Sequence, residues 1–247
     1  MKLIVVSGSG TDSGKTVTAS ALAACALAGG QRVTVIKPVQ TGVGADDLGD
    51  AEVVRALTGL SDVHELARFA EPLAPGTAAR RLGQPGPQIG ALADRILTFQ
   101  DCDLVIVEGA GGALVHLNAQ GQTLLDLACE LRARIGAESS LELVLAASCS
   151  LGTLHSTGAT ALAVRAHGLA VDHLVITDWP AGQPELAQLC NIEDLPSYAQ
   201  APVSGVLVQG MGTLDQAQFG AASRSGLAPA LGGVFNTAEF VGLASRP

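Results

Sequence analysis

A run of glycines around one lysine marks the part of the sequence that could do chemistry. Gly8-Ser9-Gly10-Thr11-Asp12-Ser13-Gly14-Lys15-Thr16 follows the apolar stretch 3–6 and precedes the alanine-rich stretch 17–28. Glycines in such a loop let backbone N–H groups turn inward around phosphate oxygens. Lys15 can bring a positive charge to the β- and γ-phosphates, and the Thr16 hydroxyl can ligate Mg²⁺ at the start of a helix. The segment therefore predicts a P-loop that binds a nucleoside triphosphate.

The chain uses lysine sparingly, which draws attention to a second lysine. Lys2, Lys15 and Lys37 are the three lysines, and the last two follow predicted strands at glycine-containing turns. Lys37 ends the apolar run 32–36 and opens the segment Lys37-Pro38-Val39-Gln40-Thr41-Gly42. Because proline disfavours a helix here, we expect Lys37 and Thr41 to lie on a loop at the carboxyl edge of the sheet, beside the P-loop.

A carboxylate is predicted at the same edge. Residues 103–107 form an apolar run that ends at Glu108 and continues into Gly109-Ala110-Gly111-Gly112. A buried strand that ends in an acid is the second standard part of the metal site of a P-loop enzyme. Asp46, Asp47 and Asp50 precede the predicted helix 51–57. These aspartates could cap that helix or ligate the metal.

The remaining elements must hold these residues in place. Gly29-Gly30 ends the first helix, residues 60–87 are expected to form a covering loop or short helices, and a further helix is expected at 88–99. Strands are predicted at 143–148, 174–177 and 203–208, with a helix between the first two and a short helical segment at the end. Alternating strands and helices predict one α/β domain over residues 1–247, with the P-loop NTPase fold, a mostly parallel central sheet and helices on both faces.

Composition and charge limit the kinds of partner and the compartment that we expect. The 247 residues are 48% hydrophobic and 15% charged, which excludes a disordered chain, and a net charge of -9 argues against nucleic acid as a partner. No apolar run reaches the roughly 20 residues of a membrane span, and no secretory leader is recognised. The five cysteines are scattered and are interpreted as small core residues of a protein in a reducing compartment. We therefore expect a cytoplasmic protein.

Four segments together resemble the dethiobiotin synthetases. They are 8–16, Lys37-Pro38-Val39-Gln40-Thr41-Gly42, the run from Glu108 to Leu114, and Ser150-Leu151-Gly152-Thr153-Leu154. The five residues between Gly8 and Gly14, one more than the usual P-loop spacing, are also similar to that family. The resemblance implies ATP- and Mg²⁺-dependent ring closure of 7,8-diaminononanoate with CO₂ to give dethiobiotin, a step of biotin biosynthesis. It also implies a homodimer with the substrate at the interface.

The resemblance assigns roles to individual residues. It makes Lys15, Lys37 and Thr11 catalytic. It assigns the nucleotide to Gly10, Thr11, Asp12, Ser13, Gly14, Lys15, Thr16, Val17, Thr177 and Trp179. It assigns the diamine to Lys37, Thr41, Gly111, Gly112, Leu151, Thr153, Leu154 and His155, the last four contributed by the partner subunit. It assigns Mg²⁺ to Thr16, Glu108 and an aspartate, with Asp50 favoured over Asp47.

Two positions depart from the family pattern. His155-Ser156 stands where the family usually has Asn-His, which leaves recognition of the distal substrate carboxylate open. The asparagine that reads adenine in many members is missing from Thr177-Asp178-Trp179-Pro180, so the preferred base is open, and Trp179 could stack on a base or pack in the core.

A different function class uses a similar fold. A partitioning ATPase or P-loop switch would act through a protein partner, but such ATPases typically carry a second lysine where this chain has Gly10. A GTP switch would need an Asn-Lys-x-Asp base reader, which the sequence lacks. The sequence therefore favours an enzyme over a switch.

Overall fold

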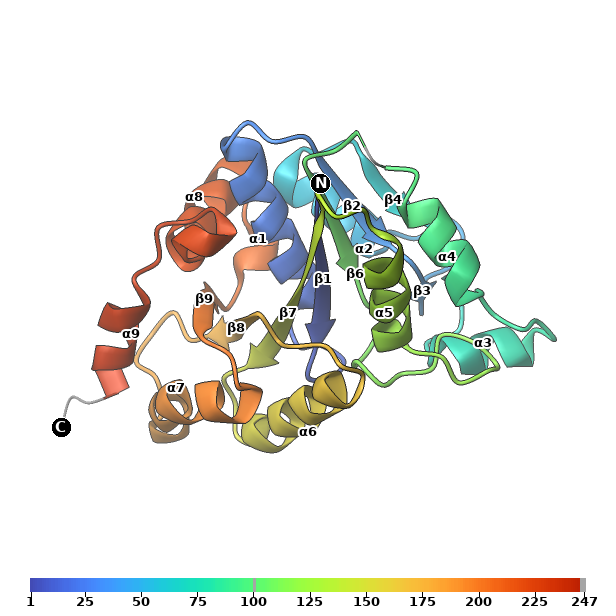
Figure 1. The fold of residues 1–247 in the computed structure, drawn as a ribbon. Coiled ribbons are helices and arrows are strands. Elements are labelled where there is room, and N and C mark those ends of the chain that lie inside the picture. The colour runs from blue at the N-terminus through green and yellow to red at the C-terminus, as the bar shows by residue number, and fades with distance from the viewer. Residues whose placement is uncertain (100, 245–247) are drawn as a thin grey trace.

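A seven-stranded sheet forms the centre of the molecule in the computed structural model, which describes residues 1–99 and 101–244 (Figure 1). The strand order is β4-β2-β6-β1-β7-β8-β9, and every neighbouring pair is parallel. The strands are β1 (Lys2–Gly8), β2 (Val33–Lys37), β4 (Val63–Glu65), β6 (Leu104–Glu108), β7 (Ser140–Ser148), β8 (His173–Trp179) and β9 (Val203–Val208). The predicted parallel α/β fold is confirmed.

Helices cover both faces of this sheet (Figure 1). They are α1 (Lys15–Ala28), α2 (Asp50–Thr58), α3 (Pro75–Arg81), α4 (Ile89–Ile96), α5 (Leu124–Arg134), α6 (Thr153–Ala166), α7 (Leu186–Ala199), α8 (Gln216–Gly226) and α9 (Thr237–Ala244). Two short 3₁₀ turns lie at Met211–Thr213 and Pro229–Leu231.

Alternation along the central strand produces two cores. Leu3 and Val5 of β1 pack in a cluster with α4, α5 and α6, whereas Ile4 and Val6 pack with α1, α2 and α8. Successive side chains of a strand point to opposite faces, so a strand buried on both sides is apolar throughout. This explains why the continuous apolar runs of the sequence were recognisable as strands.

Residues 60–87 contain more regular structure than the sequence predicts. Besides α3, which is one of the expected short helices, the segment holds β4 and the two-residue strand β5 (Arg68–Phe69). β5 pairs in parallel with β3 (Gln40–Thr41), so the prediction of a loop at Thr41 is wrong. Lys37 is likewise the last residue of β2, not a loop residue. Strands this short carry no alternation pattern that a sequence could reveal.

The cysteines are all free, but not all belong to the core. Cys25 and Cys149 are buried, Cys102 and Cys129 are half-buried, and Cys190 is exposed on α7. The prediction of a core position is therefore wrong for Cys190. Within the described part of the chain, no helix is both long enough and apolar enough to cross a membrane.

Candidate active site

The predicted chemical residues meet at one edge of the sheet because β2, β6 and β1 are neighbours. Val6 of β1 pairs in register with Glu108 of β6. The acid at the end of β6 therefore lies beside the end of β1, where the P-loop begins. A pocket of ≈ 400 Å³ opens there. Its lining consists of Thr11, Asp12, Gly14, Lys15, Thr16, Val17, Lys37, Gln40, Thr41, Asp50, Glu108, Ala110, Gly111 and Asp178.

The P-loop depends on glycine at both ends. A Cβ on Gly8 would lie 2.0 Å from Ser13 Oγ, and Gly14 has a φ of +75°, which side chains rarely adopt. Gly14 directly precedes α1, and a Cβ on it would also lie 2.7 Å from Thr177 Cβ, so only glycine fits between the loop and β8. A helix N-terminus of this kind attracts phosphate oxygens. Strand, loop and helix follow one another as predicted, and phosphate binding by the loop stays a prediction.

Lys15 folds back over this loop. Its Nζ donates a hydrogen bond to the carbonyl oxygen of Gly10 at 2.9 Å, and Ser13 Oγ donates to the same oxygen at 2.9 Å. Burial lowers the pKa of Lys15, and the nearby Lys37 ammonium lowers it further. Two cations held this close in a partly dry pocket favour an anionic ligand.

Lys37 lies between two carboxylates. Its Nζ donates to Glu108 Oε1 at 2.7 Å and to the Gly109 carbonyl at 3.1 Å, and it forms an ion pair with Asp50. Burial pushes the pKa of Lys37 down, but Glu108 and Asp50 outweigh it and hold that pKa above its ordinary value. Thr16 Oγ1 donates to the same Glu108 oxygen at 2.7 Å. A hydroxyl and two carboxylates therefore surround one cationic group.

This donor set fits a hard divalent cation. Mg²⁺ prefers oxygen ligands and usually takes one or two carboxylates together with substrate phosphates. Thr16, Glu108 and Asp50 supply such oxygens, whereas the exposed Asp47 accepts a hydrogen bond from Gly44 N at 3.2 Å and does not line the pocket. The position of Asp50 in the pocket therefore favours it over Asp47 as a metal ligand. Among residues 1–99 and 101–244, no cluster of three or more His, Cys, Asp and Glu side chains could hold a metal.

The residues predicted to contact the diamine fall into two groups. Thr41 and Gly111 line the pocket with the two lysines, and Gly112 adjoins the P-loop, where its Cβ position is 3.6 Å from Gly10 Cα. By contrast, Leu151 and Thr153 line a separate recess of ≈ 400 Å³ on the other side of the P-loop. His155 is exposed and Leu154 half-buried at the start of α6. Within one chain, the structure does not bring residues 151–155 to the lysine pocket.

Thr177 and Trp179 both end β8, but neither lines the pocket. Thr177 is buried and donates to the Ser13 carbonyl at 3.1 Å, so it contacts the P-loop from behind. Trp179 is buried edge-on against Phe240, with ring centroids 4.9 Å apart. The structure therefore places Trp179 in the core packing between β8 and α9.

Three residues of the pocket, Gln40, Ala110 and Asp178, had no role in the sequence predictions. Gln40 lies in the quoted segment 37–42, but nothing in its type indicates that its side chain is buried. Asp178 has a positive φ of 54°, and burial and the nearby Asp12 raise the pKa of its carboxyl. A positive φ at a residue other than glycine cannot be read from a sequence.

A glycine loop between β1 and α1, a lysine on that loop and an acid on the neighbouring β6 define a P-loop nucleotide-binding protein of the α/β class. A family described as "AAA domain" matches residues 2–216. The cell division ATPase MinD of Pyrococcus furiosus is similar in fold, with a TM-score of 0.53, 18% identity, and coverage of 99% of this chain and 97% of that one. The GDP complex of the signal recognition particle receptor FtsY from Elizabethkingia anophelis has a TM-score of 0.55 and 19% identity, and this chain, covered completely, spans 63% of it.

Curated proteins narrow this class to one family. The ATP-dependent dethiobiotin synthetase BioD of Frankia casuarinae is 48% identical over 241 residues, which cover 97% of this chain and 98% of that protein. The protein of the same name from Streptomyces coelicolor is 45% identical over 243 residues, again 97% of this chain and 98% of that protein. The chain belongs to the ATP-dependent dethiobiotin synthetase family.

Proposed function

We propose that the chain closes the ureido ring of dethiobiotin, using 7,8-diaminononanoate, CO₂ and a nucleoside triphosphate, in biotin biosynthesis. One observation carries this proposal: Lys15 of the P-loop and Lys37 of β2 line the same pocket, beside Glu108. A P-loop that only bound nucleotide would need the first lysine. A second buried lysine suits an enzyme that must hold an additional anion next to the γ-phosphate.

Nucleotide binding is assigned to the loop from Gly10 to Thr16 and to Val17. The positive end of α1 and the Lys15 ammonium both attract the triphosphate. Thr16, Glu108 and Asp50 would hold Mg²⁺, which neutralises charge on the phosphate oxygens when it is bound. Because Lys37 is already paired with two of these groups, metal binding must share or replace its contacts.

The reaction needs no nucleophile from the protein. One substrate amine adds to CO₂ and loses a proton, which gives a carbamate. A carbamate oxygen then attacks the γ-phosphorus, the bond to the β-phosphate oxygen breaks, and a nucleoside diphosphate leaves. The second amine attacks the carbonyl carbon of the carbamic-phosphoric anhydride, and phosphate departs with the former carbamate oxygen.

Lys15 and Lys37 would stabilise the charge that develops in the phosphoryl transfer. Thr11, which lines the same pocket, would contact the same oxygens. Thr41 and the backbone at Gly111 and Gly112 would hold the diamine. Their place in or beside the lysine pocket supports this assignment.

We further propose that the chain acts as one domain over residues 1–247 and as a homodimer in the cytoplasm. Residues 151–155 lie outside the lysine pocket of their own chain, which supports a contribution from the partner subunit to the distal substrate carboxylate. Five free cysteines suit a reducing compartment.

Isotope transfer tests the proposed chemistry. Enzyme, nucleotide, Mg²⁺ and diamine are mixed with freshly dissolved C¹⁸O₂, and the products are analysed by mass spectrometry after a short time. We expect one labelled oxygen in the phosphate and one in the ureido carbonyl. Unlabelled phosphate would mean hydrolysis by water and would contradict the carbamate route.

The lysines offer a matched pair of variants. Lys15→Ala should lower turnover by about 10²- to 10³-fold, the effect of losing one preorganised donor. Lys2→Ala is the control, because Lys2 pairs with Glu142 at 2.8 Å and is outside the pocket. Equal activity of both variants would remove Lys15 from the catalytic set.

A further inference from the structure

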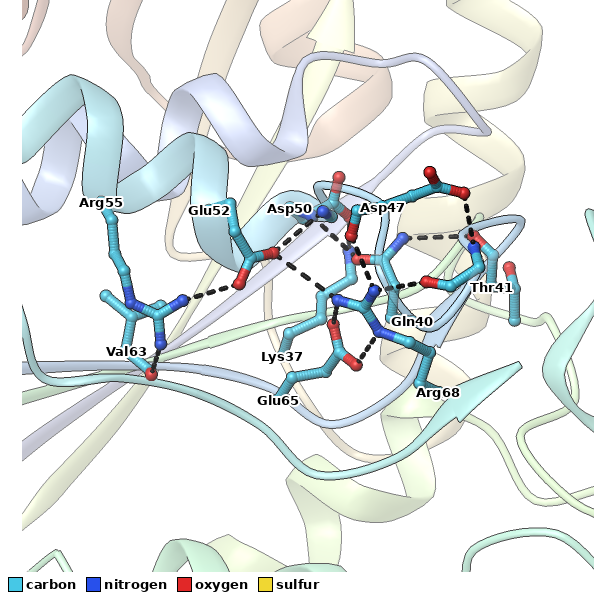
Figure 2. Close-up of polar contacts among 12 residues, drawn as sticks. Lys37, Gln40, Thr41, Asp47, Asp50, Glu52, Arg55, Val63, Glu65 and Arg68 are labelled. Atoms are coloured by element: carbon cyan, nitrogen blue, oxygen red, sulfur yellow. Dashed lines mark hydrogen bonds and ion pairs between the residues drawn. The ribbon is translucent and has the colours of Figure 1, made fainter. Parts of the chain in front are cut away.

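The segment between β3 and α2 delivers Asp50 to the pocket, and side chains from both strands of the small sheet hold it (Figure 2). Gln40 of β3 and Arg68 of β5 are paired in register in this sheet. Figure 2 shows both side chains directed toward the segment that leads into α2. Neither residue has a role in the chemistry described above.

Gln40 supplies a hydrogen-bond acceptor that α2 lacks at its start. The residue before the helix is Gly49, which has no side chain for capping. Gln40 Oε1 accepts a hydrogen bond from Asp50 N at 3.0 Å, and Gln40 Nε2 donates to the Thr41 carbonyl at 3.1 Å. One partner is an N–H and the other a C=O, so this orientation of the amide satisfies both. Gln40 is only 6% exposed, which keeps water from competing.

Arg68 ties down the backbone on the other side of Gly49. Its Nη1 donates to the Gly44 carbonyl at 2.7 Å and to the Asp47 carbonyl at 2.8 Å. Its Nε and Nη2 donate to the two oxygens of Glu65 at 2.6 and 2.9 Å. The planar guanidinium can make these contacts at once, which the point charge of a lysine could not.

The side chains of Gln40 and Arg68 come together at Gly49. A Cβ there would lie 3.1 Å from Arg68 Nη2 and 3.1 Å from Gln40 Oε1. The Gly49 N–H in turn donates to Glu52 Oε2 at 2.9 Å, and that oxygen is 3.6 Å from Arg68 Nη2. The backbone before Asp50 is therefore held on each side, while the Asp50 carboxylate is left for Lys37.

We propose that Gln40 and Arg68 are positioning residues that fix Asp50 for the divalent cation. This inference rests on the metal role of Asp50 in the proposed function. Partners that orient a metal ligand typically contribute about 10- to 100-fold in affinity. Gln40→Met and Arg68→Met should each weaken cation binding by about 10-fold, while the affinity for the nucleotide analogue measured without metal stays unchanged.

Binding of Mn²⁺ tests this without turnover. Mn²⁺ is titrated into protein loaded with a non-hydrolysable ATP analogue, and free Mn²⁺ is followed by electron paramagnetic resonance against the analogue alone. The variants are Gln40→Met, Arg68→Met and Asp50→Asn. Asn236→Ala is the control, because it removes a helix-start hydrogen bond to Glu239 N, 3.3 Å long, at α9. The affinity for the analogue without metal is measured alongside by calorimetry.

The outcomes separate the two claims. Weaker Mn²⁺ binding in the first three variants supports the positioning role, provided that Asn236→Ala is unchanged and that Gln40→Met and Arg68→Met bind the metal-free analogue normally. If Asp50→Asn binds Mn²⁺ normally, the metal assignment itself fails. If only Asp50→Asn is impaired, the positioning role is overturned and the metal assignment stands. Should Gln40→Met not fold, Gly49→Ala displaces the same two side chains and replaces it in the comparison.

Discussion

Replacing Lys37 with methionine removes the cation that two carboxylates share. Glu108 is 1% exposed and would keep only the Thr16 hydroxyl at 2.7 Å as a side-chain partner. Asp50 has a side chain that is 32% exposed, so water can solvate it after the change. The loss therefore comes mainly from Glu108. We expect a large destabilisation in spite of the good apolar fit of methionine.

The magnitude follows from the burial of the pair. Removing one partner of a buried ion pair typically costs about 3–5 kcal/mol, because the other charge stays buried and unpaired. At about 2–4 °C per kcal/mol for a chain of this size, the Tm should fall by roughly 6–20 °C. Because the pKa of Lys37 is raised in the folded protein, its ammonium is fully charged at any pH below the ordinary lysine pKa. An assay near pH 7.5 therefore measures the full loss of stability.

Chemical denaturation gives the comparison. Unfolding midpoints in urea are measured for the unsubstituted protein, Lys37→Met and the double variant Lys37→Met/Glu108→Gln, with the slope of the transition checked for constancy. The double variant should recover most of the loss, because no charge remains buried there. A single variant within about 1 kcal/mol of the unsubstituted protein, or a double variant as unstable as the single, would mean that the buried Glu108 charge does not depend on Lys37.

Two further predictions concern other sites. Thr177→Val removes the hydrogen bond to the Ser13 carbonyl but keeps the shape against Gly14. This variant should raise the KM for nucleotide by about 5- to 10-fold, because one hydrogen bond contributes about 1–1.5 kcal/mol. The KM for diamine should not change. Thr177→Ser keeps the hydroxyl and should restore the KM for nucleotide. The second prediction concerns Glu142. Burial alone would raise its pKa, but Lys2 and His173 outweigh burial and lower that pKa. The contribution of Glu142 to stability is therefore present above the ordinary carboxyl pKa and lost as the pH falls through the pKa of the folded state. Glu142→Gln should be less stable than the unsubstituted protein at pH 7 and as stable as it at low pH. Thermal melts at several pH values measure this difference.

Much of the fold could be predicted, because the central strands are apolar on both faces. The buried run that ends at Glu108 and the loop between Gly8 and Thr16 were enough to place both at the carboxyl edge. Helices α5 and α7 were missed, and the single short helical segment expected at the end proved to be two helices, α8 and α9. α5 has a polar side with charged residues, and α7 contains Pro196, so neither shows a clean apolar stripe.

The finer geometry of the candidate site was not predictable. Asp47 and Asp50 are three residues apart and chemically identical, and the choice between them depends on where α2 begins. That start is set by contacts from Gln40 and Arg68, which come from strands of two residues. Trp179 packs on Phe240, which is distant in the sequence. Contacts of this kind depend on the assembled fold and leave no local pattern.

Product formation shows whether this protein closes the ureido ring. The protein is incubated with Mg²⁺, bicarbonate and ATP, with and without 7,8-diaminononanoate, and phosphate release is compared with cyclic urea measured by mass spectrometry. We expect phosphate release that depends on the diamine and equals the dethiobiotin formed. Nucleotide hydrolysis that is indifferent to the diamine, with no cyclic urea, would contradict it.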